Sequence, residues 1–230
     1  MNIRLFIFSI FSTFAIISAE PVFITQLNTF VQNIAREYGM SDWQIEVTIH
    51  HDINYAGALV TSFKKGLIVI GPECAKLFKT EPKQLRAIIG HELSHLLHYD
   101  GFKGALITNL MGTIKNTMSI YTGYITYKKA SKSRYKSRLL RVAAGLSAFL
   151  LSRYILDKLN SVIFAQINQK IEKRADSESA KILGTRDELI AFLNKMLQKE
   201  KSSPSPTFIQ RLFDSHPPAE DRIDNLRAST

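Results

Sequence analysis

The stretch "IIGHELSHLLHYDG", residues 88–101, holds three histidines, a glutamate and an aspartate among leucines and isoleucines. Polar side chains of this kind are costly to bury without partners, so their presence on an apolar segment needs an explanation. His91, Glu92 and His95 spell H-E-x-x-H. On a helix, residues four apart share one face, so the two imidazoles can reach the same ion. We therefore expect His91 and His95 to be metal ligands, with zinc as the metal.

Glu92 follows the first of these histidines and lies near the same face, where its carboxylate can reach a water molecule polarised by the metal. A glutamate in this place takes a proton from the water and passes it to a leaving amine, so we expect Glu92 to be the catalytic base. The longer pattern H-E-x-x-H-x-x-G-x-x-H is not present. His98 stands where its glycine would be, and Gly101 stands where its third histidine would be. We interpret His98 and Asp100 as bystanders and look elsewhere for the third ligand.

The segment E-K-R-A-D, residues 172–176, is the best source of that ligand. Glu172 and Asp176 are four residues apart, so they share a helix face. A catalytic zinc often takes two histidines and one carboxylate and keeps its fourth position open. We expect Glu172 to be the third ligand and Asp176 to accept the second N–H of a ligand histidine. Without the H-E-x-x-H motif, an exposed acidic pair beside Lys173 and Arg174 would be the better interpretation.

These motifs, followed by Ser215-His216-Pro217 and by Arg222, resemble in their order the HtpX-like, CAAX-prenyl-protease-like zinc metallopeptidases. The resemblance covers roughly residues 23–227 and implies one zinc ion per chain, with Glu172 as the third ligand. It further implies that His216 stabilises the oxyanion and that Arg222 helps to order the site. A histidine in a rigid His-Pro turn suits such a donor.

The resemblance also implies a fold: an α+β, mostly helical, gluzincin-like metalloprotease domain with a small antiparallel sheet beside the H-E-x-x-H helix. Independently, apolar alternation predicts three strands, at residues 43–50, 56–63 and 64–71. A sheet edge at residues 54–59 or 66–71 is expected to hold an extended peptide by strand addition.

The residue patterns also predict several helices. The helix that carries the motif is expected to begin near Pro82 and to stop at Asp100-Gly101. The other expected helices cover residues 104–127, 139–165, 170–184 and 187–200.

Composition limits the class of protein. With 230 residues, the chain is long enough for one domain with a sizeable core. Its single cysteine, Cys74, excludes an intramolecular disulfide and a cysteine-rich zinc module. The formal net charge is +10, and seven of the excess positive charges lie in residues 128–141. The rest of the chain is therefore only mildly basic.

Residues 1–19 are expected to form a signal peptide or an N-terminal anchor: Arg4 is followed by the apolar run 5–17, and Ala19 offers a cleavage point. We therefore expect the metallopeptidase domain, residues 20–230, to be exported. It would be periplasmic or membrane-associated, with its active site on the non-cytoplasmic side.

A helical hairpin insert, residues 104–165, separates the two halves of the site and carries the basic loop 128–141. In one interpretation, residues 104–127 and 139–160 cross a membrane and leave the basic loop inside. Lys115, in the middle of the first crossing, weighs against it, since a charge there costs about 2.5–3.5 kcal/mol. In the other, the hairpin is amphipathic and lies on an anionic membrane. Both predict membrane association.

The sequence thus predicts a zinc metalloendopeptidase that hydrolyses protein or peptide substrates, by family analogy in membrane-associated quality control. Two alternatives stay open. One is a zinc-binding chaperone or assembly factor that keeps the protease fold, and the other is a membrane-binding module whose histidines are structural. Nucleic acid is not an expected partner, because the basic loop has Tyr135 as its one aromatic residue and export conflicts with such a role. The pattern does not indicate an oligomeric state.

Overall fold

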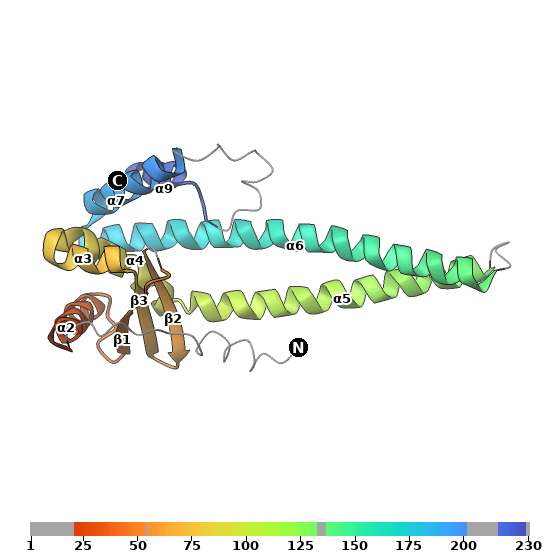
Figure 1. The fold of residues 1–230 in the computed structure, drawn as a ribbon, viewed down its shortest axis with the longest axis horizontal. Helices are drawn as coiled ribbons and strands as arrows, with labels where there is room; N and C mark the ends of the chain where they lie inside the picture. Colours follow the sequence, from red (N-terminus) through yellow and green to blue (C-terminus); the bar gives the residue numbers. More distant parts are fainter. Residues whose placement is uncertain (1–20, 54, 133–136, 202–215, 229–230) are drawn as a thin grey trace. The chain divides into compact units, whose positions relative to one another are not determined.

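The structure, a computed structural model, describes residues 21–53, 55–132, 137–201 and 216–228. The predicted signal or anchor lies outside these residues. The described elements are α2 (Pro21–Glu37), β1 (Gln44–Ile49), β2 (Ala56–Ser62), β3 (Lys65–Ile70), α3 (Pro72–Thr80), α4 (Pro82–Leu97), α5 (Asp100–Lys132), α6 (Arg138–Leu183), α7 (Arg186–Lys201) and α9 (Ala219–Ala228). Figure 1 shows a mostly helical protein with one small sheet, which confirms the predicted fold class.

The chain divides into two compact units. The first, here called the sheet unit, contains everything up to Gly101, the end of α6 from Ile171, and helices α7 and α9. The second, here called the hairpin unit, contains α5 from Phe102 and α6 up to Lys170.

The sheet is mixed, with the strand order β1-β3-β2, so the prediction of an antiparallel sheet is wrong for one of its two pairings. β2 and β3 form an antiparallel hairpin, and Lys64 in its turn has a positive φ of 54°. β1 instead pairs with β3 in parallel, with Val47 beside Ile68. The cause is the connection after β1, which places β2 on the far side of β3. Because β3 is paired on both sides, residues 66–71 cannot offer a free edge, and β2 remains as the predicted peptide-binding edge.

Helix α4 is anchored in the core of the sheet unit along almost its whole length. It packs with buried residues of α2 and the sheet, including Leu27, Ile34, Ile68 and Ile70. Its own buried apolar residues are Leu85, Ala87, Ile88, Ile89, Leu93 and Leu96. Burying a leucine or isoleucine side chain contributes about 1.5–3 kcal/mol, so the position of this helix is strongly determined.

Glycines permit two close approaches to α4. A Cβ on Gly66 would lie 2.7 Å from Leu96 Cδ1, so the central strand can carry no side chain there. Within α4, a Cβ on Gly90 would lie 2.4 Å from Leu183 Cδ1 and 2.6 Å from Ser179 Oγ. The end of α6 therefore packs directly against the turn of α4 that precedes His91.

Two predicted helix boundaries are wrong. α4 ends at Leu97, and Tyr99 adopts a left-handed φ of 54° with its ring 5.3 Å from that of Trp43. Asp100 consequently begins α5 rather than stopping α4, as suits an acidic residue at a helix N-terminus. The helices predicted at 139–165 and 170–184 form one helix of 46 residues, α6, because residues 166–169 contain neither glycine nor proline. α6 ends before Gly184, whose φ is +63°.

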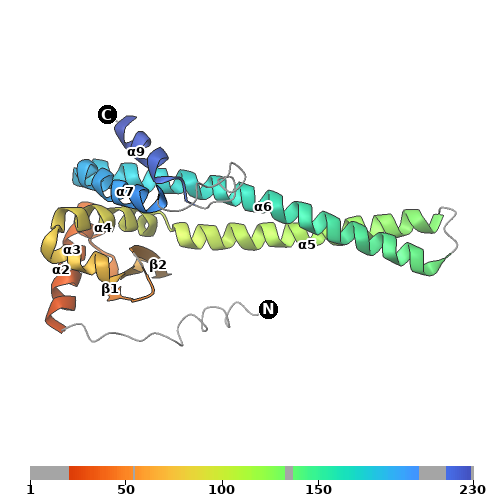
Figure 2. The same cartoon turned by 45° about the horizontal axis from the view of Figure 1, so that its top comes forward.

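In the hairpin unit, α5 and α6 run side by side, as Figures 1 and 2 both show. They approach most closely at two glycines: a Cβ on Gly123 would lie 3.0 Å from the carbonyl oxygen of Gly145, and the reverse distance is also 3.0 Å. A polar contact joins the same helices, because Lys115 Nζ lies 2.5 Å from Asp157 Oδ1. Lys115, whose charge weighed against a membrane crossing, therefore has Asp157 as an ion-pair partner.

The outer surface of the hairpin unit is apolar. Large apolar side chains that are 49–59% exposed include Leu106, Leu110, Ile114, Leu146, Leu150 and Leu159. Surfaces of this kind mark sites of protein or membrane contact. Among the described residues, α6 alone is long and apolar enough to cross a membrane, judged by length and composition only. The predicted crossing at residues 104–127 does not meet that measure.

Candidate metal centre

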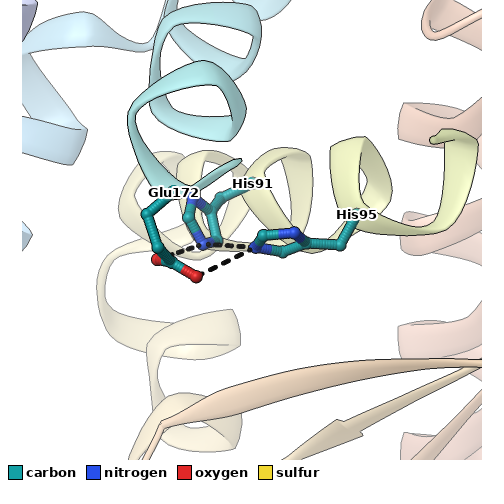
Figure 3. Close-up of side chains that lie close together, drawn as sticks. All are labelled: His91, His95 and Glu172. Carbon is teal, nitrogen blue, oxygen red and sulfur yellow. Dashed lines mark hydrogen bonds and ion pairs between the residues drawn. The ribbon is translucent and has the colours of Figure 1, made fainter. Parts of the chain in front are cut away.

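The three predicted ligands lie together in the sheet unit. His91 and His95 project from successive turns of α4, and Glu172 projects from α6 (Figure 3). The two Nε2 atoms are 3.1 Å apart. Glu172 Oε2 is 3.5 Å from His91 Nε2, and Glu172 Oε1 is 3.5 Å from His95 Nε2. Within the described part of the chain, these residues form a group whose ligand atoms all lie within 4.8 Å of one another.

These distances fit a tetrahedral metal ion. Zinc binds imidazole nitrogen and carboxylate oxygen at about 2.0–2.2 Å, so two ligand atoms on one edge of the tetrahedron lie about 3.3–3.5 Å apart. The observed separations of 3.1–3.5 Å match that edge with little rearrangement. Two histidines and one carboxylate also leave a coordination position open, as in catalytic zinc sites.

The proton positions on the two imidazoles lead to the same conclusion. His91 Nδ1 lies 2.9 Å from Asp176 Oδ1, and His95 Nδ1 lies 2.9 Å from Asp100 Oδ2. A carboxylate beside Nδ1 favours the tautomer with its proton on that atom, which leaves the Nε2 lone pair free. The lone pairs of the two Nε2 atoms and the Glu172 carboxylate would then face one another in a mostly buried site. Because three hydrogen-bond acceptors repel one another, this arrangement is stable only with a cation or an extra proton between them.

Asp176 and Arg222 form a buried ion pair behind His91. Arg222 Nε and Nη2 each donate a 2.7 Å hydrogen bond to one oxygen of Asp176, and Arg222 Nη1 lies 3.2 Å from Glu172 Oε2. Asp176 is 0% exposed and Arg222 is 6% exposed. The arginine therefore contacts both carboxylates of the E-K-R-A-D segment.

Asp100 was missed. Its carboxylate contacts His95, and Arg174 donates a short hydrogen bond to the same oxygen, Oδ2. Asp100 lies five residues after His95, outside the helical spacing on which the sequence interpretation relied. The left-handed turn at Tyr99 brings it back to the histidine. The sequence feature that could have indicated this contact is an aspartate just after the helix that carries the two histidines.

His98 contacts Glu178. Its Nε2 lies 2.9 Å from Glu178 Oε1, and Ser94 donates a 2.5 Å hydrogen bond to the other carboxylate oxygen. The interpretation of His98 as a bystander stays a prediction.

Burial tunes the acid–base groups of the centre. It raises the pKa of Glu92, and the nearby positive charges of His91 and His95 only partly offset this. A glutamate with a raised pKa is suited to accept and return a proton near neutral pH. Burial lowers the pKa of His91, but contacts with Asp176 and Glu172 outweigh it and bring the pKa to about 10 in the metal-free chain. A metal ion must therefore displace a proton to bind.

His216 is exposed and lies three residues before α9. Its expected role at the oxyanion stays a prediction.

A model of peptidase family M48 matches residues 24–230. The chain belongs to peptidase family M48. The resemblance found in the motifs is thereby confirmed, and so is the prediction of a metalloprotease at the level of its family.

Relatives of this M48 family member include a "Protease HtpX homolog" of Nitrosomonas europaea, 26% identical over 211 residues, which cover 86% of the chain and 69% of the relative. A "Protease HtpX" of Stenotrophomonas maltophilia is also 26% identical, over 95% of the chain and 78% of the relative. The crystal structure of S. mikatae Ste24p shares the fold, with a TM-score of 0.64 and 17% identity over 97% of the chain. The chain spans about half the length of that structure, since it covers 54% of it.

Proposed function

We propose that this M48 family member is a zinc-dependent endopeptidase that hydrolyses peptide bonds in protein substrates at a membrane. The observation that carries the proposal is the meeting of His91 Nε2, His95 Nε2 and the Glu172 carboxylate at 3.1–3.5 Å. Carboxylates occupy the Nδ1 side of both histidines, so the three ligand atoms have no better partner than a divalent cation.

In this proposal His91, His95 and Glu172 hold one zinc ion. Bound zinc supplies a Lewis acid that polarises the substrate carbonyl and lowers the pKa of water. Glu92 takes the proton from the attacking water and delivers it to the leaving amine, for which its raised pKa is suited. His216 donates a hydrogen bond to the developing oxyanion.

The positioning of the ligands falls to the buried ion pair. Asp176 holds the Nδ1 side of His91, and Arg222 fixes Asp176 and Glu172 together. Arg222 also places a positive charge close to the reaction centre, and this charge lowers the pKa of Asp176 against the effect of its burial.

The decisive experiment compares zinc content and proteolysis in the same preparations. We expect the purified wild type to hold one zinc ion per chain and to cleave an unfolded protein such as reduced casein. Glu92→Gln should keep the zinc and lose the cleavage. Glu46→Gln is the matched control, because Glu46 is an exposed glutamate on β1.

Three results would contradict the proposal. Cleavage by Glu92→Gln at the wild-type rate would refute the role of Glu92 as the catalytic base. A wild type that holds zinc but cleaves no protein would favour the alternative, a zinc-binding chaperone or assembly factor. A wild-type protein that holds no near-stoichiometric zinc at neutral pH would refute the proposed metal centre.

The membrane part of the proposal is that the domain is exported and that the hairpin unit holds it at the membrane. It is supported by the exposed apolar side chains of α5 and α6 and by the length and composition of α6. The active site then faces the non-cytoplasmic side, on which misfolded or membrane-proximal proteins are the expected substrates.

Labelling of single cysteines in spheroplasts tests this orientation. In a Cys74→Ser background, Asp52→Cys reports the side of the sheet unit and Lys129→Cys reports the basic loop. Labelling of Asp52→Cys by an impermeant maleimide in unbroken spheroplasts supports export, and labelling only after lysis refutes it. Labelling of Lys129→Cys only after lysis indicates a hairpin that crosses the membrane, whereas labelling in unbroken spheroplasts indicates one that lies on its outer surface.

A further inference from the structure

Both histidines of the centre have a carboxylate close to Nδ1, and the two carboxylates come from different parts of the chain. Asp176 lies 2.9 Å from His91 Nδ1 and is fixed by Arg222. Asp100 lies 2.9 Å from His95 Nδ1, and its Oδ2 also accepts a short hydrogen bond from Arg174. Each ligand histidine therefore has an aspartate at its Nδ1 and an arginine behind that aspartate. Figure 3 shows the result, with both Nε2 atoms pointing toward Glu172.

The second of these arrangements is not a surface ion pair. Asp100 is 7% exposed and Arg174 has 34% of its side chain exposed. Asp100 Oδ1 is buried and makes no hydrogen bond within the described part of the chain. An unsatisfied buried oxygen costs about 1–3 kcal/mol, which offsets part of what the contacts of Oδ2 contribute. The contacts of this carboxylate are therefore concentrated on one oxygen, the one that faces His95 and Arg174.

The backbone conformation before Asp100 also determines where its carboxylate lies. Tyr99, with its left-handed φ of 54°, separates α4 from α5, and the carboxylate of Asp100, which follows it, lies 2.9 Å from His95 in the last turn of α4. Arg174 comes from α6, between Glu172 and Asp176, and lies 4.0 Å from Glu178 Oε1. The same turns of α6 thus supply one ligand and a support for each histidine.

We propose that Asp100, fixed by Arg174, is a positioning residue for His95. It holds the imidazole in the tautomer and orientation that present Nε2 to the metal, and its charge makes that nitrogen a stronger ligand. The inference rests on the proposed zinc site and adds to it a support that the family motifs discussed above do not contain.

The test measures metal affinity, with no need for activity. Zinc binding is measured by competition with a chromophoric chelator for the wild type, Asp100→Asn and Asp100→Ala. Loss of such a support typically lowers metal affinity 10- to 100-fold, and we expect about 10-fold for the asparagine and more for the alanine. Asparagine keeps the shape and the ability to begin a helix, so Asp100→Asn separates ligand support from folding. The visible absorption of the cobalt-substituted variants should also shift, because the His95 ligand changes.

Asp52→Asn is the matched control. Its carboxylate also lies near a histidine, 3.9 Å from His50 Nδ1, but it is 89% exposed and far in sequence from the ligands. Its zinc affinity should equal that of the wild type.

Each outcome decides between the proposals. An Asp100→Asn protein whose zinc affinity and cobalt spectrum match those of the wild type would overturn the positioning role, while the zinc site would stand. A wild type that binds no zinc would instead refute the proposed function. Weaker binding by Asp100→Asn and Asp100→Ala, with Asp52→Asn unchanged, supports the role of Asp100.

Discussion

Replacing Arg222 by methionine should destabilise the sheet unit strongly, because the buried Asp176 carboxylate loses the charge and both hydrogen bonds of Arg222. Arg222 donates two hydrogen bonds of 2.7 Å to Asp176, which is 0% exposed and so gains no water in exchange. Hydrogen bonds to charged groups contribute about 1.5–3 kcal/mol each, which gives about 3–6 kcal/mol for the two. Breaking a buried ion pair from one side costs about 3–5 kcal/mol, in agreement with that range.

The assay is thermal unfolding of the metal-free protein in detergent, at pH 7. For a chain of this size, each 1 kcal/mol lowers the Tm by about 2–4 °C, so Arg222→Met should melt about 6–20 °C below the wild type. Arg227→Met is the matched control on the same helix. The side chain of Arg227 is 65% exposed and lies 3.7 Å from Asp224, and exposed pairs of this kind contribute about 0–1 kcal/mol.

A double variant shows whether charge is the cause. Arg222→Met combined with Asp176→Asn removes both charges and should recover part of the lost stability, since no unpaired charge is left buried. A melting temperature of Arg222→Met within 2 °C of the wild type would refute the argument. A double variant no more stable than the single one would show that lost packing, rather than lost charge compensation, is responsible.

Three further predictions concern the metal centre. Glu172→Ala and His95→Ala should each abolish stoichiometric zinc binding, as measured by elemental analysis after dialysis; a variant that retains one zinc per chain does not lack a ligand. Zinc affinity should rise at least tenfold per pH unit between pH 6 and 8, because the raised pKa of His91 makes zinc displace a proton over that whole range, and the pKa of His95 is raised as well; a flat profile in chelator competition contradicts this. Gly90→Ala should lower the stability by about 1–3 kcal/mol despite the better helix propensity of alanine, since the new Cβ would lie 2.4 Å from Leu183 Cδ1; unchanged thermal unfolding would show that the end of α6 can move away.

The ligand group could be predicted from the sequence because its geometry is local. His91 and His95 are one helical turn apart, and Glu172 and Asp176 are also one turn apart, so each half of the centre is fixed by helix periodicity. We inferred that the two halves meet from the ligands that a catalytic zinc requires and from the order of the motifs. The strands were found for a similar reason, since alternation is a property of neighbouring residues.

The remaining features depend on the chain path, which periodicity does not describe. The position of Asp100 results from one left-handed residue, Tyr99, and few L-residues other than asparagine and aspartate favour that conformation. The parallel pairing of β1 with β3 results from a connection whose direction leaves no periodic signal. The continuity of α6 was open to prediction, because no helix-breaking residue separates its two predicted parts.

The span of chain between the ligands has a consequence for folding. His95 and Glu172 are separated by the whole hairpin unit, so a metal ion that holds both closes a loop in a chain whose single cysteine cannot form an intramolecular disulfide. In the chain-entropy description, a permanent cross-link that closes a loop of about 80 residues restricts the unfolded state by about 4–5 kcal/mol. Zinc would thus act as a reversible cross-link. The sheet unit would unfold more easily whenever a chelator or a low zinc concentration removes the ion.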